Sequence, residues 1–173
     1  MPQNVPLIHM LLSKWDMKTE SFIIKGQTLK FTSEEVALLI GMPNRGIIFD
    51  SGSGRSSGKT TNDIRRDIER MDSSTPMDDL VNCFVLYLLS NIFYPMANFR
   101  IPLAILELLN NLDTFNQYNW PESIRSFLVK ELNVVASKQA KGFGLGYVNG
   151  FVMILIVSIL CFFNKCLISV QNL

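Results

Sequence analysis

FTSEEVALLIGMP, residues 31–43, carries the best-defined folding signal in the chain. Thr32, followed three positions later by Glu35, is typical of a capping box at the start of a helix. Gly41 suits the left-handed residue that ends a helix, and the proline two positions later prevents continuation. The stretch therefore predicts a helix over 33–40.

Two elements are predicted before this helix. In ESFIIKGQTLKF, β-prone residues flank a turn at 25–27, which predicts a hairpin with strands over 21–24 and 28–31. Further upstream, apolar residues recur at spacings of three and four over 5–15 and predict a core-facing helix. His9 flanks this apolar stripe with no chemical partner nearby in the sequence, so we interpret it as a boundary residue.

Helical patterns continue after residue 61. Charged residues at ion-pair spacing, with apolar residues on one side, predict a surface helix over 62–71. The stretch from Met77 to about Phe93 is apolar nearly all round, which predicts a central helix of the core. Thr75 is expected to cap that helix, with Pro76 in its first turn.

Two more helices complete the predicted fold, one over about 102–112 and a long one that Asn119 or Trp120 can cap. Five apolar residues are expected to form the buried stripe of the long helix: Ile124, Phe127, Leu128, Leu132 and Val135. Because no strand-rich region or internal repeat is visible, the sequence predicts a mostly α fold. We expect a single helical domain with one small N-terminal β-hairpin.

Residues 51–61, SGSGRSSGKTT, raise the question of a phosphate-binding loop. A Walker A motif needs a glycine five positions before its Gly-Lys-Thr, and that position is occupied by Ser53. The sequence also lacks a βαβ succession and a later apolar strand ending in an aspartate for magnesium. We therefore interpret 51–61 as a flexible loop that connects two parts of the domain.

Charge and residue counts restrict the function further. Sixteen basic and fifteen acidic residues give a net charge of +1, so direct binding to nucleic acid would need a local patch. The basic residues between 55 and 70 are interleaved with acidic ones and lack aromatic residues for base stacking. With His9 as the single histidine and three cysteines in or beside apolar runs, we predict no catalytic, cofactor-binding or metal-ligating residue. The residues expected to matter are structural: Trp15, Phe22, Thr32, Glu35, Gly41, Pro43, Pro95, Asn119 and Trp120.

The order of several short motifs resembles a known family. A tryptophan precedes a phenylalanine-bearing hairpin, a Thr-x-x-Glu-Val helix start and a Gly-Met-Pro-x-x-Gly ending, and "FYP" and "YNWPESIRSFLVKEL" follow. Together these motifs resemble the plant mobile domain, also called the aminotransferase-like plant mobile domain, over about residues 5–156. The matching positions in the first part are Trp15, Phe22, Thr32, Glu35, Val36, Gly41, Met42, Pro43 and Gly46.

This resemblance implies a non-enzymatic, transposon-derived interaction domain that acts in the nucleus through protein or chromatin partners. Genome maintenance, silencing of mobile elements and meristem maintenance are the roles that it implies. In longer proteins a related arrangement precedes a SUMO-protease-like cysteine peptidase domain, so a noncatalytic N-terminal fragment of such a peptidase is the alternative. The family name does not imply aminotransferase chemistry, because the sequence shows no pyridoxal-phosphate constellation.

The C-terminal part of the chain is strongly apolar. An uncharged run over 147–163 has the length of a short membrane span, which makes a small membrane-anchored protein a further alternative. The resemblance instead places the start of this run in the last core helix of a domain over 1–156. We hypothesise that the divergent tail, 157–173, is translated from a retained intron, because Val157-Ser158 can be encoded by GTAAGT, a splice-donor consensus. Uninterrupted coding transcripts across this point, with no spliced product, would contradict the hypothesis.

Overall fold

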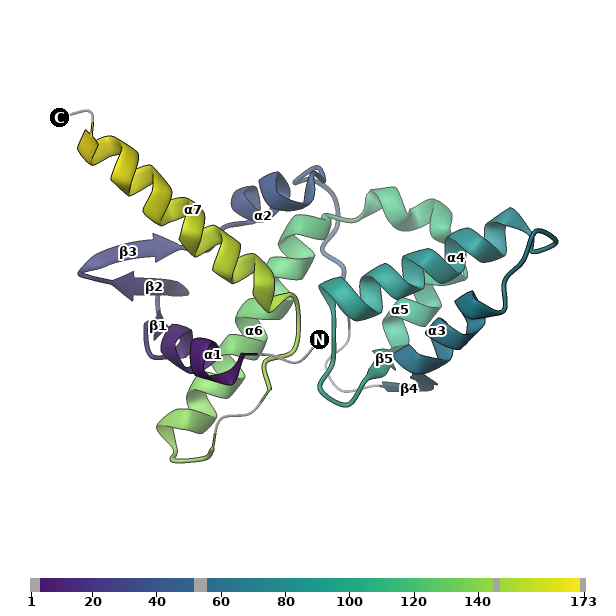
Figure 1. Ribbon diagram of the computed structural model, residues 1–173, viewed down its shortest axis with the longest axis horizontal. Coiled ribbons are helices and arrows are strands. Elements are labelled where there is room, and N and C mark those ends of the chain that lie inside the picture. Colours follow the sequence, from purple (N-terminus) through teal and green to yellow (C-terminus); the bar gives the residue numbers. More distant parts are fainter. Residues whose placement is uncertain (1–3, 52–55, 145–146, 172–173) are drawn as a thin grey trace.

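A computed structural model describes residues 4–51, 56–144 and 147–171, and it is mostly helical, as predicted. Figure 1 shows two lobes. One contains α1 (Val5–Leu12), β1 (Trp15–Asp16), β2 (Ser21–Ile24), β3 (Gln27–Lys30), α2 (Ser33–Ile40), α6 (Trp120–Ala140) and α7 (Val152–Gln171). The other contains β4 (Ser56–Thr60), α3 (Thr61–Glu69), α4 (Met77–Leu88), β5 (Arg100–Pro102) and α5 (Leu103–Leu109). A π-helical turn, η1 (Leu89–Phe93), extends α4, and a 3-10 helix, η2 (Leu112–Gln117), precedes α6.

The N-terminal hairpin is part of a three-stranded antiparallel sheet in the order β1-β2-β3. Lys25 and Gly26 both have positive φ angles, 50° and 77°, which is the geometry of a tight two-residue hairpin turn. The predicted helix over 5–15 ends earlier, at Leu12, because Trp15 pairs with Phe22 in the sheet. Their rings lie 4.8 Å apart, so the tryptophan contributes to the sheet rather than to a helical stripe.

Helix α2 has the predicted bounds, but its capping box is only half formed. The Thr32 hydroxyl accepts a bond of 3.3 Å from the Glu35 amide, and Gly41 ends the helix at φ 70°. The Glu35 carboxylate instead accepts a bond of 3.0 Å from the hydroxyl of Ser158 in α7. A complete box is found at α3, where Thr60 is the cap.

The predicted flexible loop over 51–61 is wrong for its second half. Ser56–Thr60 form β4, which pairs with β5, and the Ser57 hydroxyl donates to the Ile101 carbonyl at 2.9 Å. Lys59 forms an ion pair of 2.8 Å with Asp67 in α3. Residues 58–60, the Gly-Lys-Thr of the sequence, therefore belong to a strand, and within them Lys59 forms an ion pair and Thr60 caps a helix. Residues 52–55 lie outside the described residues.

The predicted central helix over 77–93 joins the core on one side only, through Cys83, Leu86, Leu89 and Phe93, and α6 contributes more buried residues. In α6 the predicted stripe is buried except for Phe127, which is half-buried. In α4 only Cys83 and Leu86 are buried, and Phe84 is 52% exposed. The predicted Thr75 cap is also wrong, because Pro76 occupies that position and the Thr75 hydroxyl accepts a bond from the Asp72 amide.

The chain passes between the two lobes at one place, which we call the lobe junction (46–49 and 117–123). The Ile47 amide donates to the Gln117 carbonyl at 2.8 Å, and the Asn119 amide donates to the Ile47 carbonyl at 2.7 Å. The Phe49 amide donates to the Ser123 hydroxyl at 2.7 Å. The outgoing and returning segments therefore lie side by side.

Aromatic side chains fill the space behind the lobe junction. The Phe49 ring lies 5.3 Å from the rings of Tyr118 and Trp120, and 6.1 Å from the ring of Tyr94. Tyr94 also contacts Phe127 of α6, with ring centroids 5.1 Å apart. The cluster therefore joins the apolar cores of the two lobes.

We predict that Tyr94→Phe raises the free energy of unfolding by about 1 kcal/mol. The Tyr94 side chain is fully buried, and its hydroxyl has no hydrogen-bond partner in the described part of the chain. Burial, reinforced by the charge of Asp50, raises the pKa of this phenol far above its usual value, so the group stays neutral. Urea unfolding measures the change, with Tyr87→Phe on the surface as the control; a loss of stability in Tyr94→Phe would mean that the hydroxyl is satisfied.

The apolar run over 147–163 is not one continuous helix. Helix α7 begins at Val152 and buries Ile154, Leu155 and Ile159 against the core. Among the described residues, none of the helices combines the length and the apolar character needed to cross a bilayer. The helix also continues past residue 156 without a break, so the start of the predicted tail packs on the domain.

Candidate functional site

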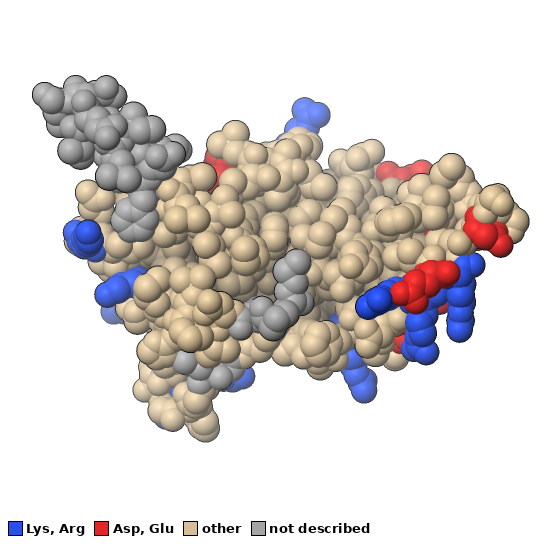
Figure 2. Space-filling model, viewed as in Figure 1, with Lys and Arg blue, Asp and Glu red and all other residues tan. Residues whose placement is uncertain are grey.

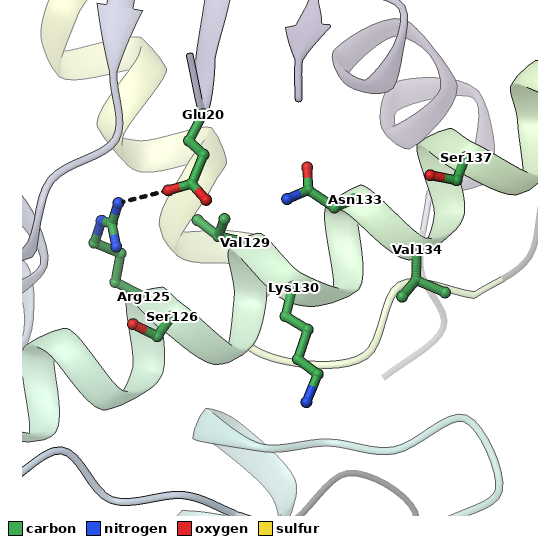
Figure 3. A pocket seen from close by; sticks show the side chains of 8 residues that line it. All are labelled: Glu20, Arg125, Ser126, Val129, Lys130, Asn133, Val134 and Ser137. Carbon is green, nitrogen blue, oxygen red and sulfur yellow. Dashed lines mark hydrogen bonds and ion pairs between the residues drawn. The ribbon is translucent and has the colours of Figure 1, made fainter. Parts of the chain in front are cut away.

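A hollow that we call the α6 groove lies between α6 and the N-terminal sheet and has a volume of about 670 Å³. Figure 3 shows Glu20 reaching toward α6 from the end of the sheet, while most of the remaining residues project from the helix. The lining residues on α6 recur at spacings of three and four: Arg125, Ser126, Val129, Lys130, Asn133, Val134 and Ser137.

Arg125 fixes the geometry at one end of the groove. Its Nε donates to the Phe31 carbonyl at 2.9 Å, one Nη donates to Glu122 at 3.0 Å and the other donates to Glu20 at 3.1 Å. Ser126 donates to the same Glu122 carboxylate at 2.7 Å. Because the Arg125 side chain is only 20% exposed, these bonds hold its planar guanidinium in one orientation.

The turn that carries Glu20 is also held firmly. Glu20 has a φ angle of 46°, in the left-handed region that a residue with a side chain seldom adopts. Asp16, at the start of this turn, accepts bonds from the Lys18 amide and the Thr19 hydroxyl, and these bonds lower the pKa of its carboxyl group. The backbone conformation of this turn therefore positions the Glu20 carboxylate at the groove.

The other end of the groove is anchored by Trp15. Its indole Nε1 donates to Asn133 Oδ1 at 2.8 Å, which fastens β1 to α6. Lys130 lines the groove but forms no ion pair within the described part of the chain, and in Figure 3 it projects away from Glu20. The groove thus combines a fixed charge cluster, in which one guanidinium pairs with two carboxylates, with one exposed lysine that has no ion-pair partner among the described residues.

A second hollow of about 400 Å³ adjoins the first, and Glu20 and Arg125 line both. Its remaining lining includes Lys30 and Glu34, together with the hydroxyl residues at 19, 32 and 33. The two hollows therefore meet at the Glu20–Arg125 pair.

Among the described side chains, His9 and Cys83 lie in different lobes. His9 in α1 is exposed, and its Nε2 lies 3.4 Å from the side-chain nitrogen of Gln139. Cys83 lies in α4 of the other lobe, and burial raises the pKa of its thiol. Within the described residues, no three or more His, Cys, Asp or Glu side chains are grouped to hold a metal ion. Among the described residues, the α6 groove has no nucleophile paired with a histidine base.

The basic residues that follow the glycine-rich stretch gather on α3, where Figure 2 shows blue and red groups intermingled at one end of the molecule. Arg65 pairs with Glu69 at 2.9 Å, Arg66 pairs with Asp63, and Lys59 pairs with Asp67. These pairs take up most of the local positive charge, which makes this surface less suited to bind phosphate groups than the sequence alone allows.

Comparison with known protein families places this fold. The chain matches the family described as "Domain of unknown function (DUF8566)" over residues 2–156. It belongs to this family. No curated protein and no solved structure matches the chain. The match includes both lobes and ends inside α7, so the Glu35–Ser158 contact of this DUF8566 chain joins the family region to a residue just beyond it. Because the family description carries no function, the resemblance to the plant mobile domain stays a prediction.

No sequence motif points to the α6 groove of this DUF8566 domain. Glu20 and Arg125 are 105 positions apart, and the sequence offers no sign that they form an ion pair. The one signal that could have helped is the hydrophilic face of the long helix, where Ser126, Lys130 and Asn133 recur on one side.

Proposed function

We propose that this chain is a non-enzymatic interaction domain that binds an acidic segment of a partner protein in the α6 groove. The observation that carries the proposal is Lys130, which lines the groove and forms no ion pair within the described residues, whereas Arg125 at the end of the groove is already bonded to Phe31, Glu122 and Glu20. A partner carboxylate can pair with Lys130 without displacing an existing bond.

The apolar part of the lining supports the same proposal. Val134 is exposed among the polar residues of α6 and can contact the aliphatic part of a bound segment, whereas Val129 beneath it is buried. Asn133 can hydrogen-bond to a peptide group, since an amide side chain offers both donors and acceptors. This mixture of polar and apolar groups is typical of sites that bind polypeptide rather than a small charged metabolite.

The resemblance to the plant mobile domain adds a biological setting to the proposal. It implies a protein or chromatin partner in the nucleus and a transposon-derived role in genome maintenance, silencing or meristem maintenance. An acidic segment of such a partner is the ligand that Lys130 would recognise.

A charge reversal in the groove tests the proposed function. We expect Lys130→Glu to weaken binding of a fluorescent pool of short acidic peptides about tenfold, because it replaces an attraction by a repulsion. Fluorescence anisotropy measures the affinity, which should also fall with rising salt because the contact is solvent-exposed.

Lys138→Glu is the matched control, because Lys138 is exposed on the same helix but does not line the groove. It makes the same change in net charge and should leave the affinity unchanged. Equal weakening by both substitutions would contradict the groove as the binding site, since it would indicate a general effect of charge. Absence of binding by the unmodified chain would contradict the proposed ligand.

A further inference from the structure

Helix α4 and the π-helical turn η1 expose large apolar side chains. Five of them, which we call the α4 stripe, recur along the exposed side of the helix: Met77 (70% exposed), Val81 (44%), Phe84 (52%), Tyr87 (39%) and Ile92 (37%). The opposite side of the same segment packs on the core through Cys83, Leu86, Leu89 and Phe93. The segment therefore has two apolar faces, one packed on the core and one, the α4 stripe, exposed.

This face carries no charge. The sequence contains no Asp, Glu, Lys or Arg from Leu80 through Phe99. Figure 2 shows the same contrast on the visible face, because the surface over α4 is almost uniformly tan while charged groups gather over α3. A contiguous exposed apolar face without charge marks an interaction site rather than ordinary surface.

We propose that the α4 stripe is the interface of a homodimer, in which the α4 helices of two copies pack antiparallel about a two-fold axis near Phe84. A second copy presents an equally uncharged stripe of the same length, so the two faces complement each other without an unpaired charge.

The charges at the ends of the stripe select the antiparallel arrangement. Asp78 and Asp79 lie at its N-terminal end, and Ile92 lies at its C-terminal end. In a parallel pair the two N-terminal ends, with their acidic residues and the like ends of the helix dipoles, would lie side by side, which is unfavourable. In an antiparallel pair they lie roughly 20 Å apart, at opposite ends of the interface, because a helix rises about 1.5 Å per residue.

The exposed area sets the expected strength of the dimer. The five side chains leave on the order of 400 Å² uncovered per copy, given the size of large apolar and aromatic side chains. Two copies with their rim residues bury on the order of 1,000 Å², at the lower end of specific interfaces. An interface of this size is typical of weak, reversible association.

Sedimentation velocity of the full chain, from about 1 to 200 μM, tests the proposal across the range in which such a dimer dissociates. The unmodified chain should shift from monomer to dimer, and about 1 M salt should not weaken the association, because the interface is apolar. Phe84→Glu should leave the chain monomeric throughout. Val81→Glu provides a second variant if Phe84→Glu does not fold, and circular dichroism checks the folding of both.

Matched variants distinguish the proposed interface from nonspecific hydrophobic association. Leu38→Glu alters an apolar residue in α2 that is 82% exposed and lies outside the stripe, so it should leave the dimer intact. Ile92→Lys should weaken the dimer less than Ile92→Glu, because an antiparallel partner brings Asp78 and Asp79 close to position 92. A chain that stays monomeric at all concentrations, or one in which Leu38→Glu acts like Phe84→Glu, would overturn the proposed interface. Equal weakening by Ile92→Lys and Ile92→Glu would overturn the antiparallel arrangement.

Discussion

Trp120→Ala is expected to lower the free energy of unfolding by about 4 kcal/mol. Trp120 is 3% exposed and begins the central helix α6. Its ring centroid lies 4.5 Å from that of Phe115 and 5.3 Å from that of Phe49, so removing the indole leaves a large cavity at the lobe junction. Urea unfolding followed by circular dichroism measures the loss.

Trp120→Phe separates packing from hydrogen bonding at this position. It keeps an aromatic ring but removes the indole Nε1, which donates to the Phe115 carbonyl at 3.0 Å. Its expected cost is about 1 to 2 kcal/mol, well below the cost of the alanine variant. A Trp120→Ala protein as stable as the parent would show that the aromatic cluster does not hold the lobes together.

Gly46→Ala is expected to lower the free energy of unfolding by about 3 kcal/mol, from backbone strain and overpacking together. Gly46 has a φ angle of 114°, and a Cβ atom there would lie 2.4 Å from the Gln117 carbonyl oxygen. Relief of this overlap requires the two chain segments to separate, which weakens the bonds between Ile47, Gln117 and Asn119. Thermal and urea unfolding both report the change.

Gly41→Ala is the matched control for this prediction. Gly41 also has a positive φ angle, 70°, but a Cβ atom would meet nothing within 4 Å. The control should cost about 1 kcal/mol, the strain of a left-handed alanine alone. Equal losses in the two variants would mean that close approach at the lobe junction is unimportant.

Local signals in the sequence predicted individual elements well. Helix α2 has the predicted bounds because Thr32 and Gly41 act through backbone groups a few positions away, and these interactions depend little on the rest of the fold. For α6 the sequence left Asn119 and Trp120 open as the cap, and the cap is Asn119. The hairpin is found close to its predicted place, and the third strand was missed because it consists of only two residues, Trp15–Asp16.

Features that depend on distant residues were not predictable. The apolar character of Met77–Leu88 predicts a buried helix, but the sequence does not predict that one side of this helix remains exposed. The strand Ser56–Thr60 has a composition typical of loops and exists because Arg100–Pro102 provides its partner. The same limit applies to the α6 groove, whose walls come from opposite ends of the sequence.

The lobe junction has a consequence for the order in which the protein folds. Ile47 and Tyr118 form a parallel bridge, although about 70 residues separate them, so joining them directly from the unfolded chain carries a large loop-closure entropy. Most of the intervening residues form the second lobe, whose contacts are comparatively local in sequence. If that lobe forms first, it brings the two ends together and shortens the effective loop, so the N-terminal sheet can dock on α6 without a long conformational search.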